Sequence, residues 1–257
     1  MKQLEELKKN ALETALDKPI KNLISFGKDA KTIKGEKYGV RTGIVYLAPG
    51  NLSGFEVCPS RTRGCTAACL FTAGQGRYAN VKQGRLRRTY TFTHRTQEFL
   101  TRLLVEIDKE KTKVGDSMLL AIRLNGTSDI AYEDYPVTDV DGTVYPNIFA
   151  ARRDVQFYDY TKRFARLDRI KAIPNYHVTF SRADTVANQI NSGLAIAKGF
   201  NITVVFRNEL PEKYMGYRVV DGDETDIRFW DSGSEPVVIG LKAKGKAVTD
   251  ESGFVVD

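Results

Sequence analysis

Hydrophobic positions recur along the chain with the spacing of helices in some segments and as short continuous runs in others. In the first eighteen residues a helical spacing is kept by Leu4, Leu7, Ala11, Leu12, Ala15 and Leu16. This spacing predicts an amphipathic N-terminal helix that ends before Pro19. A second helix is predicted over about 96–109, where Phe99, Leu103 and Ile107 repeat every fourth residue. Sequence compatible with a helix also follows Gly76 and fills 182–197.

Short apolar runs alternate with these helical segments. They lie at 43–48, 118–124, 155–160, 176–181, 202–207, 217–220 and 237–242. Continuous apolar runs are typical of strands buried on both faces, and their alternation with helices favours a parallel sheet with crossover helices. We therefore expect a single α/β domain over 1–257, built as an open doubly wound sheet or as a complete or partial (β/α) barrel.

Polar side chains follow several predicted strands, where parallel architectures place their functional residues. Asp159 lies beside aromatic rings near the end of one run, so Asp159 and Lys162 are candidate catalytic or substrate contacts. The same aromatic alternation is also typical of a packed core. His177 points away from its apolar neighbours and would face a barrel interior. It is either a catalytic acid or base or a hydrogen-bonding strand residue.

The composition is that of an ordinary globular protein, with 42% hydrophobic residues in a chain of 257. This excludes disordered and fibrous architectures. No run of eighteen apolar residues occurs, and the N-terminus carries acidic residues where a signal peptide would be apolar. We therefore expect a cytoplasmic protein without a membrane partner.

The formal net charge of +7 is concentrated in one segment. Between Arg61 and Arg102, nine basic residues stand against a single acidic one, a local charge of +8. Aromatic residues are interleaved with them, and this combination is typical of proteins that bind single-stranded nucleic acids through phosphate contacts and base stacking. The alternatives are a helix whose aromatics face the core, or arginines that hold a phosphorylated small substrate. The candidate contacts are Arg77, Arg85, Arg87 and Arg88.

The three cysteines, Cys58, Cys65 and Cys69, fall within twelve residues of a loop at about 50–76. An odd, clustered set is unlike a disulfide framework and favours metal binding in a reducing compartment. Three thiolates match an iron–sulfur cubane with one open iron. Zinc would need a fourth ligand, and neither His94 nor His177 lies at finger-like spacing. Small buried thiols that only pack are the third possibility.

A second candidate metal site lies in an acidic segment, where residues 221–226 hold four carboxylates. Asp221, Asp223 and Asp226, with Asp231, would supply oxygen ligands for Mg²⁺ or Ca²⁺ in a metal-dependent hydrolase. The alternative is a solvated acidic hairpin turn with Gly222 at positive φ.

A buried strand, a loop with three cysteines and a following helix resemble the radical S-adenosylmethionine (SAM) enzymes. The resemblance implies a radical-SAM-like (β/α) barrel in which the cysteines hold a [4Fe–4S] cluster and SAM binds the fourth iron. It also implies a SAM-binding role for the residues after the second strand. The spacing C-x6-C-x3-C departs from the usual C-x3-C-x2-C of that superfamily. The implied SAM-binding residues are Asn125, Gly126, Thr127, Ser128 and Asp129.

A wider resemblance is to the bacteriophage gene product 88 family. It is carried by residues 47–54, the cysteine segment, 123–129, 155–162, 175–177, 221–226 and 241–245. That family has no assigned activity, so the resemblance implies a phage or prophage origin and the bacterial host cytoplasm. Together these patterns predict an iron–sulfur protein, an enzyme if it is of the radical SAM type, that acts on a nucleotide or nucleic acid. The alternative is a non-enzymatic nucleic-acid-binding protein stabilised by zinc or by its cysteines.

Overall fold

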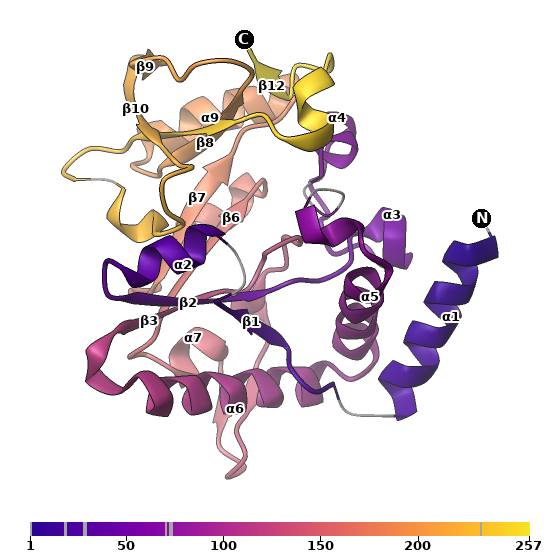
Figure 1. The fold of residues 1–257 in the computed structure, drawn as a ribbon. Coiled ribbons are helices and arrows are strands. Elements are labelled where there is room, and N and C mark those ends of the chain that lie inside the picture. Colours follow the sequence, from indigo (N-terminus) through magenta and orange to yellow (C-terminus); the bar gives the residue numbers. More distant parts are fainter. Residues whose placement is uncertain (1, 18–19, 28–29, 70, 72–73, 232) are drawn as a thin grey trace.

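The computed structural model describes residues 2–17, 20–27, 30–69, 71, 74–231 and 233–257 and shows a mixed α/β fold (Figure 1). Ten strands form the main sheet, in the order β1-β2-β3-β6-β7-β8-β11-β10-β9, with β12 also paired to β8. A separate small sheet pairs β4 with β5. The strands are β1 (Ile24–Phe26), β2 (Val40–Val45), β3 (Leu119–Arg123), β4 (Val137–Thr138), β5 (Val144–Tyr145), β6 (Gln156–Thr161), β7 (Tyr176–Ser181), β8 (Ile202–Phe206), β9 (Lys213–Tyr214), β10 (Tyr217–Asp221), β11 (Val238–Lys242) and β12 (Val255–Val256).

Helices connect most of the neighbouring parallel strands. The helices are α1 (Lys2–Asp17), α2 (Ala30–Glu36), α3 (Gly50–Ser53), α4 (Arg63–Ala67), α5 (Ala79–His94), α6 (Thr96–Val114), α7 (Ile148–Ala151), α8 (Leu167–Ile170) and α9 (Val186–Ala197). The predicted N-terminal helix, the helix from residue 96 and the helix ending at 197 are therefore confirmed.

The sheet is open, so the complete (β/α) barrel that was one of the expectations is not formed. Strands β2, β3, β6, β7, β8, β11 and β10 run parallel, in agreement with the predicted mostly parallel sheet. At the two edges, β1 and β9 pair antiparallel with one neighbour each. A barrel closes only when its first and last strands pair with each other, and here each edge ends in a short reversed strand.

One face of the sheet, the helix-covered face, packs against α6, α7, α8 and α9 and forms the main core. The three positions that repeat every fourth residue in α6, Phe99, Leu103 and Ile107, are all fully buried there. Burying each such side chain contributes about 1.5–3 kcal/mol of transfer free energy. The hydrophobic period of this helix therefore fixes which of its sides meets the sheet.

The opposite face of the main sheet, called the second face below, has a smaller apolar cluster. It contains Val40, Ala121, Tyr158 and Ile227, with Phe229 packed against it. Because Ile227 contributes to this cluster, the segment between β10 and β11 lies over this face. Helix α2 contacts the same segment, since Lys31 donates a hydrogen bond to the carbonyl of Gly222.

Helix α1 lies along α5 at the side of the molecule (Figure 1). A third apolar cluster joins α1 and α5 to the start of the cysteine loop. Its buried members are Ala11, Ala48, Leu52, Phe71, Leu86 and Tyr90. Within the part of the chain that the structure describes, no helix is long and apolar enough to cross a membrane.

Candidate functional site

The cysteine loop and the 125–129 turn meet at the carboxyl edge of the parallel strands. The loop follows β2 and the turn follows β3. The hydroxyl of Thr127 donates to the carbonyl of Leu47 at 2.6 Å, and the N–H of Asp129 donates to the carbonyl of Val57 at 2.7 Å. Two segments that the sequence separates by about seventy to eighty residues are thus bound to each other where parallel folds place their sites.

The three cysteines approach this edge from different parts of the loop. The thiol of Cys58 donates to the carbonyl of Thr127 at 3.7 Å. Thr62 caps α4 by accepting a hydrogen bond from the N–H of Cys65 at 3.1 Å. This cap starts α4 at Arg63, and the helix ends at Ala67, before Cys69.

The thiols share one electrostatic neighbourhood. The pKa of Cys58 is raised to about 12, first by burial and then by the nearby charges of Asp129, Cys69 and Cys65. The pKa of Cys69 is also raised by burial, against the lowering effects of the Phe71 N–H, Lys162 and Arg85. Without a bound cation these two thiols are therefore protonated at neutral pH.

The donor chemistry of this neighbourhood can be compared with what metals require. Among the described residues, no three His, Cys, Asp or Glu side chains gather closely enough to hold a single metal ion. An iron–sulfur cluster differs from a single ion, because its thiolates bind separate irons and need only surround a common volume. The charges of Cys65 and Cys69 act on the pKa of Cys58, and the cationic side chains of Lys162 and Arg85 act on the pKa of Cys69.

A buried polar network supports the 125–129 turn from the helix-covered face. The side-chain oxygen of Asn125 accepts hydrogen bonds from Ser128 Oγ and from the N–H of Ile130, both at 2.8 Å. The carboxylate of Asp129 accepts from Thr161 Oγ1 at 2.8 Å and from the N–H of Lys162 at 2.9 Å. The turn is thereby tied to the end of β6.

Arg166 connects this network to the protein interior. Its guanidinium bonds Asp129 at 2.8 Å and binds both oxygens of Glu133 at 2.7 Å. The side chain of Arg166 is only 1% exposed, so the pairing takes place out of water. Nothing in the local sequence around Arg166 signals this role, which depends on partners more than thirty residues away.

Asp159, in β6, and Lys162, the residue that follows β6, point to opposite faces of the sheet. Asp159 is buried on the helix-covered face, where burial raises its pKa to about 7 against the lowering effect of the Asn125 N–H. Lys162 lies on the second face, and its ammonium donates to Ser181 Oγ at 2.6 Å. Lys162 also lies near the thiols, since its charge lowers the pKa of Cys69. Asp159 instead supports the 125–129 turn from the helix-covered face.

Most of the arginines in the basic segment contact the protein itself. Arg85 is buried, with its guanidinium 4.9 Å from the ring centre of Tyr46. Arg88 donates two hydrogen bonds to the carbonyl of Asn22. Arg77 lies over the ring of Tyr78, 5.5 Å from its centre, and Arg87 is partly buried. The interleaved aromatics Tyr90, Phe92 and Phe99 are buried, whereas Tyr78 is exposed.

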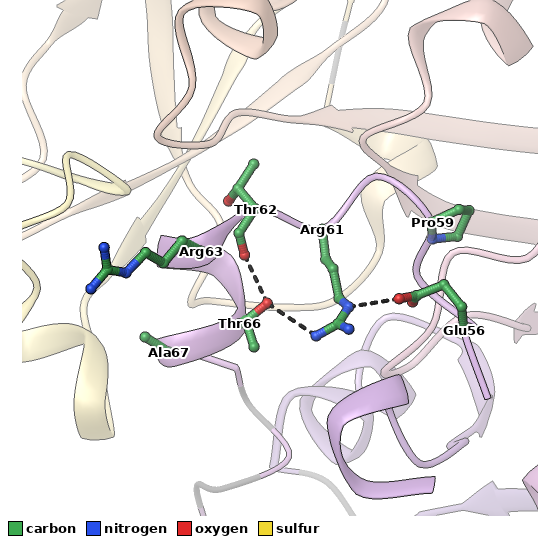
Figure 2. A pocket seen from close by; sticks show the side chains of 7 residues that line it. All are labelled: Glu56, Pro59, Arg61, Thr62, Arg63, Thr66 and Ala67. Carbon is green, nitrogen blue, oxygen red and sulfur yellow. Dashed lines mark hydrogen bonds and ion pairs between the residues drawn. The ribbon is translucent and has the colours of Figure 1, made fainter. Parts of the chain in front are cut away.

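Two surface hollows flank the cysteine loop. The first, of about 550 Å³, is lined by Glu56, Pro59, Arg61, Thr62, Arg63, Thr66 and Ala67. Figure 2 shows Arg61 held between Glu56 and Thr66, with Arg63 pointing away from them. The second hollow, of about 660 Å³, shares Glu56 and Pro59 with the first and extends to Asp129 and Arg163.

The acidic segment is bound by cations of the protein. Asp223 forms ion pairs with Lys31 and Lys244, both at 2.7 Å. Asp226 pairs with Arg123 at 3.2 Å and accepts from Tyr158 at 2.8 Å. The expectation that Gly222 has a positive φ is wrong. A glycine is needed at this position because the surrounding residues pack closely against it. A Cβ there would lie 2.4 Å from Ile239.

Fold and site together define an α/β protein with an open, mostly parallel sheet and a thiol-bearing polar site at its carboxyl edge. The model of the Gene product 88 family matches residues 9–257, and the chain belongs to that family. The family resemblance predicted from the sequence is thus confirmed. No curated protein and no solved structure matches the chain.

Proposed function

We propose that this chain is an iron–sulfur enzyme, with Cys58, Cys65 and Cys69 as the protein ligands of the cluster. The observation that carries the proposal is the shared electrostatic neighbourhood of the three thiols at the carboxyl edge of the sheet. Clustered thiols beside cationic groups are suited to anionic centres, because the cations stabilise the deprotonated ligands.

The surroundings of the thiols have the chemistry that such a centre needs. Arg85 and Lys162 both lower the pKa of Cys69, so both would stabilise its thiolate. The carbonyl of Thr127 accepts from Cys58 at 3.7 Å, which brings the 125–129 turn to the ligands. Hydrogen bonds and burial around the sulfurs are the means by which proteins tune these clusters.

SAM is the proposed co-substrate, by analogy with the radical SAM enzymes. When bound, a cluster of this type supplies the electron for reductive cleavage of SAM. The chain's own residues would orient SAM at the 125–129 turn, where Ser128 and Asp129 lie beside the cysteine loop. Because Asp129 is fixed by Arg166 and Thr161, its carboxylate position is set before any ligand arrives.

The substrate in this proposal is anionic, and the enzyme acts in the bacterial host cytoplasm. A nucleic acid bound along the basic segment is less favoured as the substrate, since the aromatic side chains of this segment are mostly buried. The arginines nearest the thiols are suited to a small anionic substrate, because Arg85 is already beside Cys69.

The test is anaerobic reconstitution with iron and sulfide, followed by iron analysis and absorbance and electron paramagnetic resonance spectra. We expect about four irons per chain and a charge-transfer absorbance that SAM perturbs. Cys58→Ser, Cys65→Ser and Cys69→Ser should each lose most of the iron. Thr66→Val is the matched control and should retain the iron, because Thr66 follows Cys65 on α4 and lines the first hollow. A colourless protein without iron, or one that instead retains a single zinc, would refute the proposal.

A further inference from the structure

A second cluster of buried polar groups lies on the second face of the sheet. Six of its side-chain nitrogen and oxygen atoms have no hydrogen-bond partner among the described residues: Arg123 Nε, Arg228 Nε, Arg228 Nη1, His177 Nε2, Thr179 Oγ1 and Asp231 Oδ2. An unpaired buried polar group costs about 1–3 kcal/mol, and native proteins pair most of them. Two of the six, Arg228 Nε and Asp231 Oδ2, form an ion pair with each other at 3.2 Å, so four atoms remain without any partner among the described residues.

The strand register explains why these side chains gather. Thr179 is paired with Tyr160, and His177 with Tyr158, so their side chains point to the same face. The 3₁₀ turn Arg228–Trp230 contacts β7 and covers this face. Arg123 reaches in from β3, with its guanidinium 4.6 Å from the ring centre of Tyr160.

The cluster has more unused donors than acceptors. Arg228 and Thr179 are fully buried, and neither Arg228 Nη1 nor Thr179 Oγ1 has a partner among the described residues. Burial and the charge of Arg228 lower the pKa of His177 to about 4, so its ring is neutral at physiological pH. The carboxylate of Asp231 is already engaged, because its Oδ2 forms an ion pair with Arg228 Nε at 3.2 Å, although the two atoms make no hydrogen bond.

The other carboxylate of the cluster is already occupied. Asp226 accepts a hydrogen bond from Arg123 Nη1 at 3.2 Å and another from the hydroxyl of Tyr158 at 2.8 Å. It therefore fixes Arg123 in place and leaves Nε free. The remaining groups, two guanidinium side chains and a hydroxyl, are the chemistry that recognises an oxyanion.

We propose that this cluster binds the carboxylate or phosphate group of a small molecule, with Arg228 as its main contact. The hydroxyl of Thr179 and the Nε–H of Arg123 complete the set of donors. The neutral ring of His177 adds either a donor or an acceptor, according to its tautomer. The inference goes beyond the proposed function, because this site is separate from the cysteines and does not require a cluster.

The location of the cluster suits a substrate of the carboxyl-edge site. The charge of Arg123 interacts with Tyr46, and the guanidinium of Arg85 lies 4.9 Å from the ring centre of Tyr46. Arg85 in turn lies near Cys69. The cluster is therefore connected to the thiols through Arg123, Tyr46 and Arg85.

Trp230 provides a direct probe of this site. It is the single tryptophan of the chain, follows Arg228 by two residues and is 53% exposed. Inorganic phosphate and acetate would be titrated separately, at constant ionic strength, into the purified full chain without metal. Trp230 emission and titration calorimetry would record binding. We expect saturable binding of at least one anion, and the anion that saturates identifies the group as phosphate or carboxylate.

Two threonine variants on the second face form a matched pair. Thr179→Val removes an unpaired hydroxyl, and we expect it to weaken anion binding about 5-fold or more. Thr203→Val removes a hydroxyl that already donates to the carbonyl of Ile239 at 3.0 Å, and anion binding should remain unchanged. Arg228→Lys should weaken binding more than Thr179→Val, since it loses the planar donor set.

Several outcomes would overturn the inference. If neither anion saturates, or if Thr179→Val binds as wild type does, the cluster holds only buried water. Thermal unfolding of each variant identifies any loss of binding that comes from misfolding. Cys58→Ser should bind the anion normally, so a failure of this inference and a failure of the iron–sulfur proposal can be told apart.

Discussion

The carboxylate of Asp159 accepts two hydrogen bonds from a single residue, Asn125. The backbone N–H of Asn125 donates at 2.7 Å and its side-chain amide at 3.1 Å. A third hydrogen bond comes from the hydroxyl of Tyr176 at 3.0 Å. Because Asn125 begins the turn that contacts the cysteine loop, Asp159 positions the candidate site without lying in it.

This arrangement makes stability depend on pH. Burial raises the pKa of Asp159 to about 7, whereas its unfolded value is about 3.9. Between these pH values the folded state binds more protons than the unfolded state, so the free energy of unfolding falls as pH rises from about 4 to 7. We expect Asp159→Asn to reduce this decline, whose contribution from one proton is at most about 1.4 kcal/mol per pH unit.

Chemical denaturation at a series of pH values measures this effect. Burial also raises the pKa of Asp231, to about 6, so some decline should remain in Asp159→Asn. Asp168→Asn is the control, because it makes the same substitution at an exposed aspartate that pairs with Lys198. An equally steep profile in Asp159→Asn and wild type would show that Asp159 is ionised across the whole range.

The buried ion pair of Arg166 gives a second prediction. Arg166→Met would leave the carboxylates of Glu133 and Asp129 buried without their cation, and we expect the free energy of unfolding to fall by about 3–5 kcal/mol. Arg169→Met removes an arginine that is 55% exposed, pairs with Asp134 and lies 3.9 Å from Glu133, so its effect should stay below about 1 kcal/mol. Denaturant unfolding compares the two.

A second substitution tests the cause of that loss. Adding Glu133→Gln to Arg166→Met removes one of the unpaired charges, so the double variant should regain part of the lost stability. A double variant less stable than Arg166→Met would show that packing, and not unpaired charge, causes the effect.

Much of the sheet could be predicted because parallel strands leave a strong local signal. The apolar runs at 118–124, 155–160 and 176–181 became β3, β6 and β7, with ends displaced by at most one residue. The rule that residues after parallel strands lie at one edge of the sheet also holds for the cysteine loop, the 125–129 turn and Lys162. It failed for Asp159, because its face depends on strand pleating and register rather than on nearness to a strand end.

The hydrogen-bond partners of the arginines in the basic segment could not be predicted from local sequence. Arg88 bonds the carbonyl of Asn22, and Arg102 bonds the carbonyl of Ile20. Both acceptors are backbone groups of a segment more than sixty residues away, and no side-chain pattern signals them. The open sheet could not be predicted either. Its edge strands β1 and β9 have three and two residues, too few to show a hydrophobic period.

The last prediction concerns Gly76, at the C-terminal end of the cysteine loop. A Cβ at Gly76 would lie 2.2 Å from the carbonyl oxygen of Phe71, a backbone atom that cannot rotate away. The N–H of Phe71 bonds Cys69. Gly76→Ala should therefore displace the backbone next to Cys69 and cost about 1–3 kcal/mol of stability.

The matched control is another glycine of the same region. Gly84 lies within α5, where an added Cβ would meet nothing closer than Arg88 Nη1 at 3.7 Å. Gly84→Ala should raise stability by about 0.5–1 kcal/mol, because alanine favours a helix interior. Thermal unfolding measures both variants, and iron content after reconstitution shows whether Gly76→Ala also impairs the thiol site. If Gly76→Ala kept wild-type stability, the approach between Gly76 and Phe71 would be looser than the structure indicates, and steric crowding would not explain this glycine.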